Sequence, residues 1–593
     1  MIETFLGYNH NYRINEAEFF DMKNMTSSHY PILSPRKKRG TYCTPANPQG
    51  MIAKDALCYV DGTDFVINDY HINLDLSTDE DSCPKTLVSM GAYVIILPDR
   101  KWVNTANFDG EVFNEKDGFG DIDSEFTTTS PVKFTLTKID ATEYTPEYTG
   151  GSEPDGDVAN GALWLDNSSS PNTLKQYSAS SGMWVSIATT YIKIESAGIG
   201  ANFAQYDGVN ISGLKDVELR SSATGDVLLG NSADQIKAID GSFVVWSRGD
   251  NYIVIIGMLD NEQTISNEIT ISRKMPLMDF VIESENRLWG CRYGVSNNGN
   301  VVNEIYSCKL GDFKNWNCFM GLSTDSFVAS CGTDGAFTGA ITHLGYPLFF
   351  KETCLHKVYG NYPANYQIQT TTCRGVQKGC HKSLDIVNEV LYYKSRSAVC
   401  AYDGSLPSEI SAAFGEVAYK DAVAGHLGNK YYISMKDDKD ESNLFVYDAA
   451  KGMWHKEDDV QVGSFCNCRG ELYYIDLKTK AIKTINGSGT EDAEAIEWMA
   501  ESGIIGASMP DKKYISRMVV RMALDTDAKV DFYIQYNSMG KYERIDTVRS
   551  ATLRSFAIPI KPKRCDHFRL KMVGVGDVKI YSITKTIEQG SDF

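Results

Sequence analysis

The sequence predicts an all-β protein: a β-propeller with an inserted small β-meander and a C-terminal β-sandwich. Three observations lead to this prediction. Short apolar runs alternate with polar or glycine turns along most of the chain, a strand–turn–strand unit recurs at spacings mostly between 40 and 45 residues, and the segment after residue 490 alternates polar and apolar side chains. A period of about 40 to 45 residues is the length of one four-stranded propeller blade.

Length and composition agree with this fold class. At 593 residues the chain exceeds what one hydrophobic core supports, so we expect two or three domains. It contains 33 Tyr and 25 Phe but only 17 Pro, a balance typical of strands, where aromatic side chains pack well on a pleated surface. The 49 Gly are spread along the chain, as many short hairpins require.

The N-terminal region divides into an arm and a first group of strands. Residues 1–50 are predicted to form an N-terminal arm, and residues 51–143 the first propeller portion. In this portion two apolar runs flank Asp61-Gly62, which is a strong hairpin signal. The first portion is expected to form a further blade or to complete the ring by pairing with the C-terminal side.

An inserted small β module is predicted at residues 144–190. A linker-like stretch rich in Gly, Glu, Pro and Thr precedes three short strands centred on Trp164, Tyr177 and Trp184. One interpretation is that these aromatic side chains are the miniature core of the module. The other is that they form a stacking platform for sugar, which makes all three candidate glycan contacts.

The main propeller blades are predicted within residues 191–490. One apolar position recurs in a shared strand–turn context, and six equivalent residues are separated by 45, 60, 43, 40 and 41 residues. These residues are Phe243, Leu288, Leu348, Leu391, Tyr431 and Leu472. The longest spacing contains an extra loop around Leu310–Trp316. Six blades are therefore counted from about residue 235.

The C-terminal segment, residues 491–593, is predicted to be a β-sandwich. Lys529–Tyr536 alternates at period two, and similar runs follow in the last forty or so residues. The short segment Glu491–Ala500 is a candidate helix.

The charge of the chain bears on its partners. The formal net charge is −19, from 58 basic and 77 acidic residues, so the chain lacks the basic balance of a protein that grips nucleic acid. The acidity is explained by solubility, or by an acidic surface along which DNA slides without adhering.

No catalytic or metal-binding motif stands out. The chain has no phosphate-binding loop, nucleophile elbow or zinc-protease motif, and its 14 Cys lack the spacing of structural zinc sites. We expect reduced thiols, no cofactor and no metal. No secretory segment and no membrane span are predicted. On these grounds we expect a protein that is not an enzyme.

One basic run interrupts the acidic sequence. Arg36, Lys37, Lys38 and Arg39 are consecutive. They form a solvated loop, pair with acidic groups of a neighbouring subunit, or contact DNA phosphates at the mouth of a channel. All four are therefore candidate DNA or subunit contacts.

Several segments together resemble a family of virion proteins. The arm segments Gly7-Tyr8-Asn9, Phe20–Met25 and Pro31–Arg36 are similar to the opening of tailed-bacteriophage virion proteins. Asn286–Trp289 with Leu310–Trp316 resembles a blade of phage tail hub and nozzle proteins, and the meander resembles small modules of phage virion proteins.

The resemblance implies a structural protein of the virion, in the tail hub, nozzle or neck conduit for DNA. It implies a homo-oligomeric ring, commonly of six copies, that is stacked on the portal or adaptor, meets other tail proteins and touches phage DNA transiently. It also implies assembly in the bacterial host cytoplasm and residence in the virion tail or neck. Two alternatives stay open: a receptor-binding or cell-wall adhesion protein of the virion, and a glycan-cleaving propeller enzyme.

Overall fold

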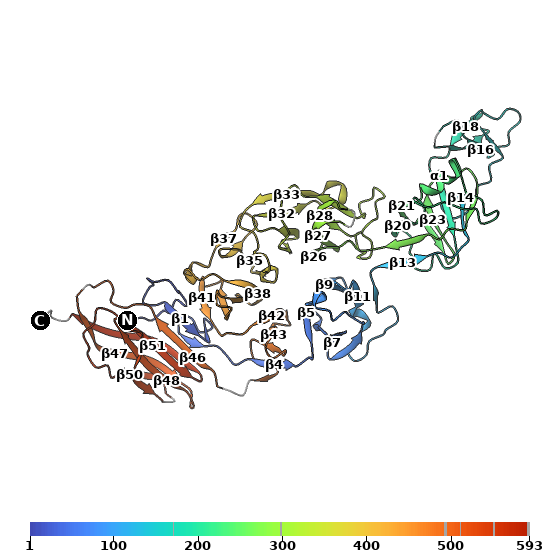
Figure 1. Ribbon diagram of the computed structural model, residues 1–593. Coiled ribbons are helices and arrows are strands. Elements are labelled where there is room, and N and C mark those ends of the chain that lie inside the picture. Colours follow the sequence, from blue (N-terminus) through green and yellow to red (C-terminus); the bar gives the residue numbers. More distant parts are fainter. Residues whose placement is uncertain (170, 297–298, 492–494, 510, 550–551, 590–593) are drawn as a thin grey trace.

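The computed structural model describes residues 1–169, 171–296, 299–491, 495–509, 511–549 and 552–589. The chain is all-β and is built from many small sheets. In the described part of the chain, one α-helix, α1 (Asn231–Lys237), and five short 3-10 turns are the only helical elements. Figure 1 shows a central group of sheets with an inserted unit at one end and the C-terminal sheets at the other.

Seven small sheets, numbered 1 to 7 in chain order, make up the central group. Each contains a meander of antiparallel neighbours. Sheet 1 contains β5 (Pro48–Lys54), β6 (Ala56–Asp61), β7 (Asp64–Ile67) and β8 (Tyr70–Asn73), and sheet 2 contains β9 (Thr86–Met90), β10 (Tyr93–Leu97), β11 (Lys101–Asn104) and β12 (Phe119–Asp121). Sheet 3 contains β26 (Phe280–Ser284), β27 (Arg287–Val295), β28 (Val301–Ser307) and β29 (Phe327–Ser330), sheet 4 contains β30 (Gly339–His343), β31 (Tyr346–Phe350), β32 (Cys354–Tyr359) and β33 (Gln367–Thr372), and sheet 5 contains β34 (Asp385–Val387), β35 (Val390–Lys394), β36 (Val399–Tyr402) and β37 (Ser408–Glu409). Sheet 6 contains β38 (Lys420–Leu427), β39 (Lys430–Lys436), β40 (Ser442–Asp448) and β41 (Met453–Lys456), and sheet 7 contains β42 (Val462–Cys468), β43 (Glu471–Asp476), β44 (Ile482–Thr484), β4 (Gly40–Cys43) and β45 (Thr490–Glu491).

Five of the six residues predicted to be equivalent occupy equivalent strands. Each lies in the second strand of sheets 3 to 7, and these residues are Leu288, Leu348, Leu391, Tyr431 and Leu472. The hairpin predicted at Asp61-Gly62 joins β6 to β7, and the extra loop at Leu310–Trp316 lies between β28 and β29.

Neighbouring sheets share hydrophobic clusters along the chain, and the last sheet packs against the first. Sheets 1 and 2 share the cluster around Phe65 and Val94, and sheets 6 and 7 share the one around Leu444 and Leu472. Ile475 of sheet 7 packs in one cluster with residues of sheet 1, and β42 contacts β5. The first strands of sheets 1, 2, 3 and 4 contact in that order through β5, β9, β26 and β30. Strand β30 contacts the 3-10 turn His381–Ser383 just before β34, and β34, β38 and β42 of sheets 5, 6 and 7 contact in that order.

Polar contacts also link neighbouring sheets. His343 Nε2 of sheet 4 lies 2.7 Å from the carbonyl oxygen of Glu389 in the β34–β35 turn of sheet 5. His426 Nδ1 of sheet 6 lies 2.9 Å from Asp385 Oδ1 of sheet 5. The hydrogen bond with Asp385 raises the pKa of His426, and burial opposes this rise only in part.

The Asp385–His426 contact predicts a pH-dependent link between sheets 5 and 6. Because the folded pKa of His426 lies above the unfolded value, its stabilising contribution is complete below the unfolded pKa and is lost as the pH rises through the folded pKa. In an NMR titration, Asp385→Asn should bring the His426 pKa to or below its ordinary value, because burial then acts alone. Asp438→Asn, which alters an exposed carboxylate, should leave that pKa unchanged; an equal effect of both variants would refute the link.

The inserted unit interrupts the central group between sheets 2 and 3. Two sheets enclose a core that includes Phe134, Ile194 and Ile253, and α1 packs on it through Ile236. Their strands are β13 (Ser124–Thr127), β25 (Thr270–Arg273), β20 (Gly208–Ser212) and β21 (Gly241–Val244); and β22 (Ser247–Gly249), β23 (Tyr252–Ile256), β19 (Tyr191–Glu195), β14 (Val132–Thr137) and β24 (Gln263–Ile265).

The prediction of a propeller repeat around Phe243 is wrong. Phe243 lies in β21, which pairs with β20 of the inserted unit and not with a blade-like sheet of the central group. The last strand of the inserted unit, β25, ends at Arg273. The apolar run resembles the later repeats because any half-buried hairpin gives the same local pattern. The three predicted strands of the meander are present as β16 (Leu163–Asp166), β17 (Thr173–Ser178) and β18 (Met183–Ser186). The stretch predicted to be a linker adds a fourth strand, β15 (Tyr148–Gly150), which pairs parallel with β16.

The C-terminal unit contains two sheets with a shared core. Trp498, Val520 and Phe532 are among the residues buried in it. Its strands are β46 (Glu497–Ser502), β51 (Phe568–Val575), β48 (Lys529–Tyr536) and β49 (Glu543–Val548) in one sheet, and β50 (Arg554–Ile558), β47 (Lys513–Leu524) and β52 (Val578–Gln589) in the other. The candidate helix at Glu491–Ala500 is wrong for residues 497–500, which belong to β46; residues 492–494 lie outside the described residues.

The N-terminal arm joins the central group to the C-terminal unit. Strand β1 (Phe19–Lys23) pairs with β46, and Ile2 and Leu33 form isolated bridges to β52. Strand β4 of the same arm pairs with β44 and β45 in sheet 7. The short pair β2 (Met25–Thr26) and β3 (Ser34–Pro35) lies between these contacts.

Candidate functional site: a charged cleft beside the arm

The arm borders a charged cleft of about 860 Å³, which we call the junction cleft. Sheet 6, sheet 7 and Met499 of β46 form the rest of its wall. Charged side chains of both signs line it: Asp21, Lys23, Arg36, Arg39, Glu441, Lys456, Glu457, Asp458, Asp459, Asp476, Lys478 and Lys483.

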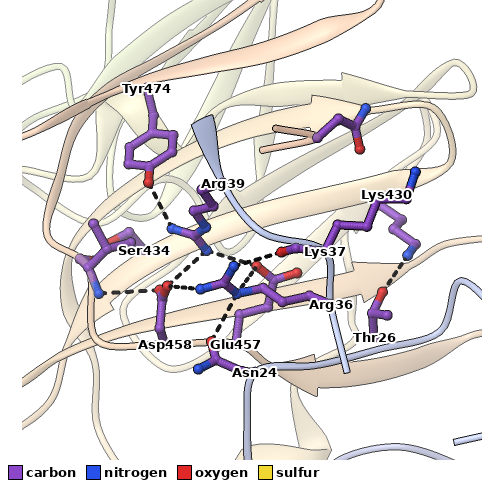
Figure 2. A network of polar contacts seen from close by, with 12 residues as sticks. Asn24, Thr26, Arg36, Lys37, Arg39, Lys430, Ser434, Glu457, Asp458 and Tyr474 are labelled. Atoms are coloured by element: carbon purple, nitrogen blue, oxygen red, sulfur yellow. Dashed lines mark hydrogen bonds and ion pairs between the residues drawn. The ribbon is translucent and has the colours of Figure 1, made fainter. Parts of the chain in front are cut away.

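Two arginines of the arm meet two carboxylates of the loop that follows β41. Arg39 Nη2 lies 2.8 Å from Glu457 Oε2 and 3.1 Å from Asp458 Oδ2. Arg36 Nη2 lies 3.1 Å from the same Asp458 oxygen. Figure 2 shows the two guanidinium groups converging on this pair of carboxylates. Because β41 ends at Lys456, the loop places both carboxylates directly at the arm.

Burial and charge act against each other at these arginines. The Arg39 side chain is 3% exposed, and its Nη1 donates a hydrogen bond of 3.1 Å to the Tyr474 hydroxyl. Burial opposes the charged form of Arg39, but Asp458, Tyr474 and Glu457 outweigh it, so the pKa of Arg39 is raised. Burial, followed by the positive charge of Arg39, lowers the pKa of Arg36. The pair of carboxylates therefore stabilises the charged form of Arg39 more strongly than that of Arg36.

Asn24 fastens the arm to both neighbouring units. Its backbone N–H donates to the carbonyl oxygen of Glu457 at 2.5 Å, and its side-chain amide donates to the carbonyl oxygen of Glu497 in β46 at 2.8 Å. Arg36 Nε donates to the Asn24 Oδ1 atom at 2.9 Å. Asn24 has a φ of 56°, a left-handed conformation that asparagine adopts more readily than most residues.

A second polar contact holds the arm against sheet 6. Lys430 Nζ donates to Thr26 Oγ1 at 2.9 Å and to Ser28 Oγ at 3.0 Å. Ser27 Oγ donates to Asp448 Oδ2 at 2.6 Å. The arm is thus bonded along its length, and Figure 2 shows the Lys430–Thr26 contact beside the arginine network.

The four predicted basic contacts separate into two groups. Arg36 and Arg39 point into the junction cleft and pair with carboxylates of their own chain. Lys37 is exposed and Lys38 is half-buried. The contact with DNA or another subunit stays a prediction for Lys37 and Lys38, while the two arginines are engaged within the chain.

The three predicted aromatic contacts cluster on one face of the meander. The Trp164 side chain, 4% exposed, lies under Lys175, whose Nζ is 4.6 Å from the ring centroid. Trp184 packs edge-on against Trp164 and Tyr177, with centroid distances of 5.5 and 5.3 Å. Trp164 is therefore part of the module's core, and the glycan contact stays a prediction for the half-buried Tyr177 and Trp184.

Sequence reasoning missed the partners of the arginines. Glu457, Asp458 and Tyr474 were not singled out, although the acidic run Glu457-Asp458-Asp459 is visible in the sequence. This run is the one signal that could have suggested a partner for the basic run. Its opposite charge alone does not distinguish it from the other acidic loops of the chain.

The arrangement of charges is suited to holding the arm against sheets 6 and 7 through ion pairs. Among the described residues, no group of three or more His, Cys, Asp or Glu could hold a metal ion, and all 14 Cys are unpaired. In the same residues no helix is long and apolar enough to cross a membrane. The buried ion pairs fix where the arm docks, because a displaced arginine would leave a carboxylate unpaired.

Comparison with known proteins gives only distant likenesses. No family model matches the chain, and no curated protein matches it. An exo-β-1,3-galactanase from Phanerochaete chrysosporium is 8% identical, with a TM-score of 0.20 over 51% of this chain and 95% of the other. A GH43 glycoside hydrolase with an engineered active site is 9% identical, with a TM-score of 0.19 over 52% and 97%.

Another likeness spans nearly the whole chain. The extracellular domain of a putative hybrid two-component system from B. thetaiotaomicron is 10% identical, with a TM-score of 0.24 over 95% of this chain and 99% of the other. The expectation that the chain is not an enzyme is contradicted, because several of the similar structures are glycoside hydrolases, and we withdraw it. TM-scores of 0.19 to 0.24 assign no activity and no site residue to this chain.

Proposed function

We propose that sheets 1 to 7 are the blades of a β-propeller and that the C-terminal unit is a β-sandwich. The contact of β42 with β5 supports closure between the last and first blades. The arm strand β4 would then complete the seventh blade from the opposite end of the chain. Such closure protects strand edges without one very large barrel.

We further propose that the protein is a structural component of a tailed-bacteriophage virion, in the tail hub, nozzle or neck conduit for DNA. The observation that carries this proposal is the arm. Its strands β1 and β4 belong to the C-terminal unit and to sheet 7, so one segment braces two units of the chain. Two of the arm segments that resemble virion proteins contact the C-terminal unit: Phe20–Met25 includes most of β1, and Pro31–Arg36 includes Leu33, which bridges to β52.

A braced subunit suits a conduit that carries mechanical load. Each arm strand is held by a row of backbone hydrogen bonds, and buried ion pairs at Arg39 fix the segment between them. Pulling the two units apart requires breaking these contacts together. In a ring of copies, the net charge of −19 would also resist adhesion of DNA along the channel.

Cryo-electron microscopy of the particles tests the proposal. We expect a coaxial ring of copies below the head, with the arm of each copy at its propeller–sandwich junction. Antibody fragments against an exposed tag in the inserted unit should decorate the particle at this level. Absence of the chain from purified particles would contradict the proposal.

The inserted unit offers a second candidate function, host adhesion. Its meander lies at the end of the molecule farthest from the C-terminal sheets (Figure 1), where Tyr177 and Trp184 are half-buried. Amphipathic aromatic rings at a projecting tip suit contact with sugar. A peripheral spike in the same images would favour adhesion over the conduit.

A further inference from the structure

A central hollow lies where the first strands of the seven sheets come together. It consists of two adjoining cavities of about 410 and 390 Å³, which share Pro84, His381 and Lys382. Residues at the beginning of β5, β9, β26, β30, β38 and β42, or just before these strands, line it. The 3-10 turn η4 (His381–Ser383), which precedes β34, also lines it, together with the β10–β11 turn and residues in or beside β39, β40 and β43.

Lys382 brings an ammonium group into this hollow without an ionic partner. Its Nζ donates a hydrogen bond of 2.9 Å to the carbonyl oxygen of Gly463, whereas an ammonium group has three donors. Among the residues that the structure describes, no carboxylate forms an ion pair with Lys382. Burial lowers the pKa of Lys382, and no nearby carboxylate offsets that effect.

The carboxylates on the walls of the hollow are already paired. Asp279 lies 2.6 Å from Arg292 Nη1, and Asp421 lies 3.3 Å from Lys436 Nζ. They do not neutralise Lys382. A largely buried cation that lacks a counter-charge favours the entry of an anion, because pairing recovers part of the lost hydration.

The rest of the wall combines apolar surface, a neutral imidazole and two cations that already have partners, Arg100 with Asp123 and Lys436 with Asp421. Leu97, Pro98 and Met275 line the larger cavity. His381 packs against Phe280 at a centroid distance of 5.3 Å, and burial, with the positive charge of Lys382, lowers its pKa to about 4. At neutral pH the imidazole is uncharged, so Lys382 remains the charged anchor of the shared wall. Apolar walls with few polar groups are typical of small-molecule sites.

We propose that the central hollow binds a small organic anion, whose carboxylate or phosphate group pairs with Lys382 and whose apolar part lies against Leu97, Pro98 and Met275. Several residues of the site come from sheets far apart in sequence, so the site exists only when the sheets are assembled. The hollow adjoins the junction cleft, with which it shares Ser442 and Gln461, but Lys382 does not line that cleft. The proposal does not depend on the virion role.

Binding of benzoate and phenyl phosphate to the full chain tests this proposal, with benzyl alcohol as the neutral counterpart. The two anions distinguish a carboxylate site from a phosphate site. We expect at least one anion to bind at millimolar or lower concentration, and benzyl alcohol to bind about tenfold or more weakly, as the loss of a charge-assisted hydrogen bond implies. Isothermal titration calorimetry measures both affinities.

Variants at Lys382 locate the site. Lys382→Met should weaken anion binding by about tenfold or more, whereas Lys382→Arg should retain it. Lys37→Met, which removes an exposed lysine of the arm, should bind as the unaltered chain does. Equal binding by Lys382→Met and the unaltered chain would overturn the proposal.

A measurement on the unaltered sequence guards against misfolding of the variants. Reductive methylation with ¹³C-formaldehyde labels the lysines, and the Lys382 resonance should shift on addition of the bound anion. Assignment comes from the loss of that resonance in Lys382→Arg. A Lys382 resonance that neither anion shifts, at concentrations up to about 10 mM, would overturn the proposal in the same way.

Discussion

Replacing Arg39 by Met is expected to lower the free energy of unfolding by about 3–5 kcal/mol, the usual cost of removing one member of a buried ion pair. The Arg39 side chain is 3% exposed, and Glu457 is equally buried. Without Arg39, the ion pair left to the Glu457 carboxylate within the part of the chain that the structure describes is the long one to Arg36 Nε, 3.9 Å away. Urea denaturation followed by circular dichroism measures the loss.

Two further variants separate the ion pair from general effects of charge removal. Lys37→Met removes a neighbouring exposed cation and should change the unfolding free energy by less than about 0.5 kcal/mol. The double variant Arg39→Met, Glu457→Leu should recover much of the loss, because it leaves no buried charge without its main partner. If Arg39→Met proves no more destabilising than Lys37→Met, the network does not hold the arm.

Replacing Gly7 by Ala should also release the arm from sheet 6. Gly7 has a φ of 83°, and a Cβ atom there would overlap the carbonyl oxygen of Trp454, to which the next residue, Tyr8, donates a backbone hydrogen bond of 2.6 Å. Left-handed strain of about 1–2 kcal/mol and overpacking of about 1–3 kcal/mol add to an expected loss of about 2–5 kcal/mol. Urea denaturation measures the total.

Gly62→Ala is the matched control for this variant. Gly62 also has a positive φ, 60°, but no atom lies within 4 Å of the position that its Cβ would take. It should show only the conformational strain, about 1–2 kcal/mol. Limited proteolysis should then cut the arm of Gly7→Ala faster than that of Gly62→Ala. Equal losses and equal cutting would show that the Trp454 contact does not position the arm.

Local patterns predicted the strands well where each strand has one buried face. Lys529–Tyr536 was expected from its alternation and coincides with β48. Leu391 and Leu472 were matched across repeats and lie in the second strands of sheets 5 and 7. The prediction of a propeller repeat at Phe243 was wrong because the apolar run around Phe243 has the same local pattern as the repeats. Its strand, β21, pairs with β20 of the inserted unit, which the local pattern does not show.

The candidate sites were less predictable from the sequence than the strands. The basic run was visible in the sequence, but its division into two engaged arginines and two more accessible lysines was not. The sequence predicted no site at Lys382, since an isolated lysine has no local signature. What distinguishes it is the absence of a carboxylate partner among the described residues, a property of its surroundings in the fold.

The sequence by itself determined the all-β class, most of the strands and the hairpin turns, because side-chain alternation and turn residues act over a few neighbouring positions. Only the tertiary structure decided that the arm binds sheet 7 and the C-terminal unit. Arg39 meets Glu457 across 418 residues, and Asn24 meets Glu497 across 473. Contacts at such separations form when packed sheets bring the segments together, and no local pattern selects one acidic loop over another.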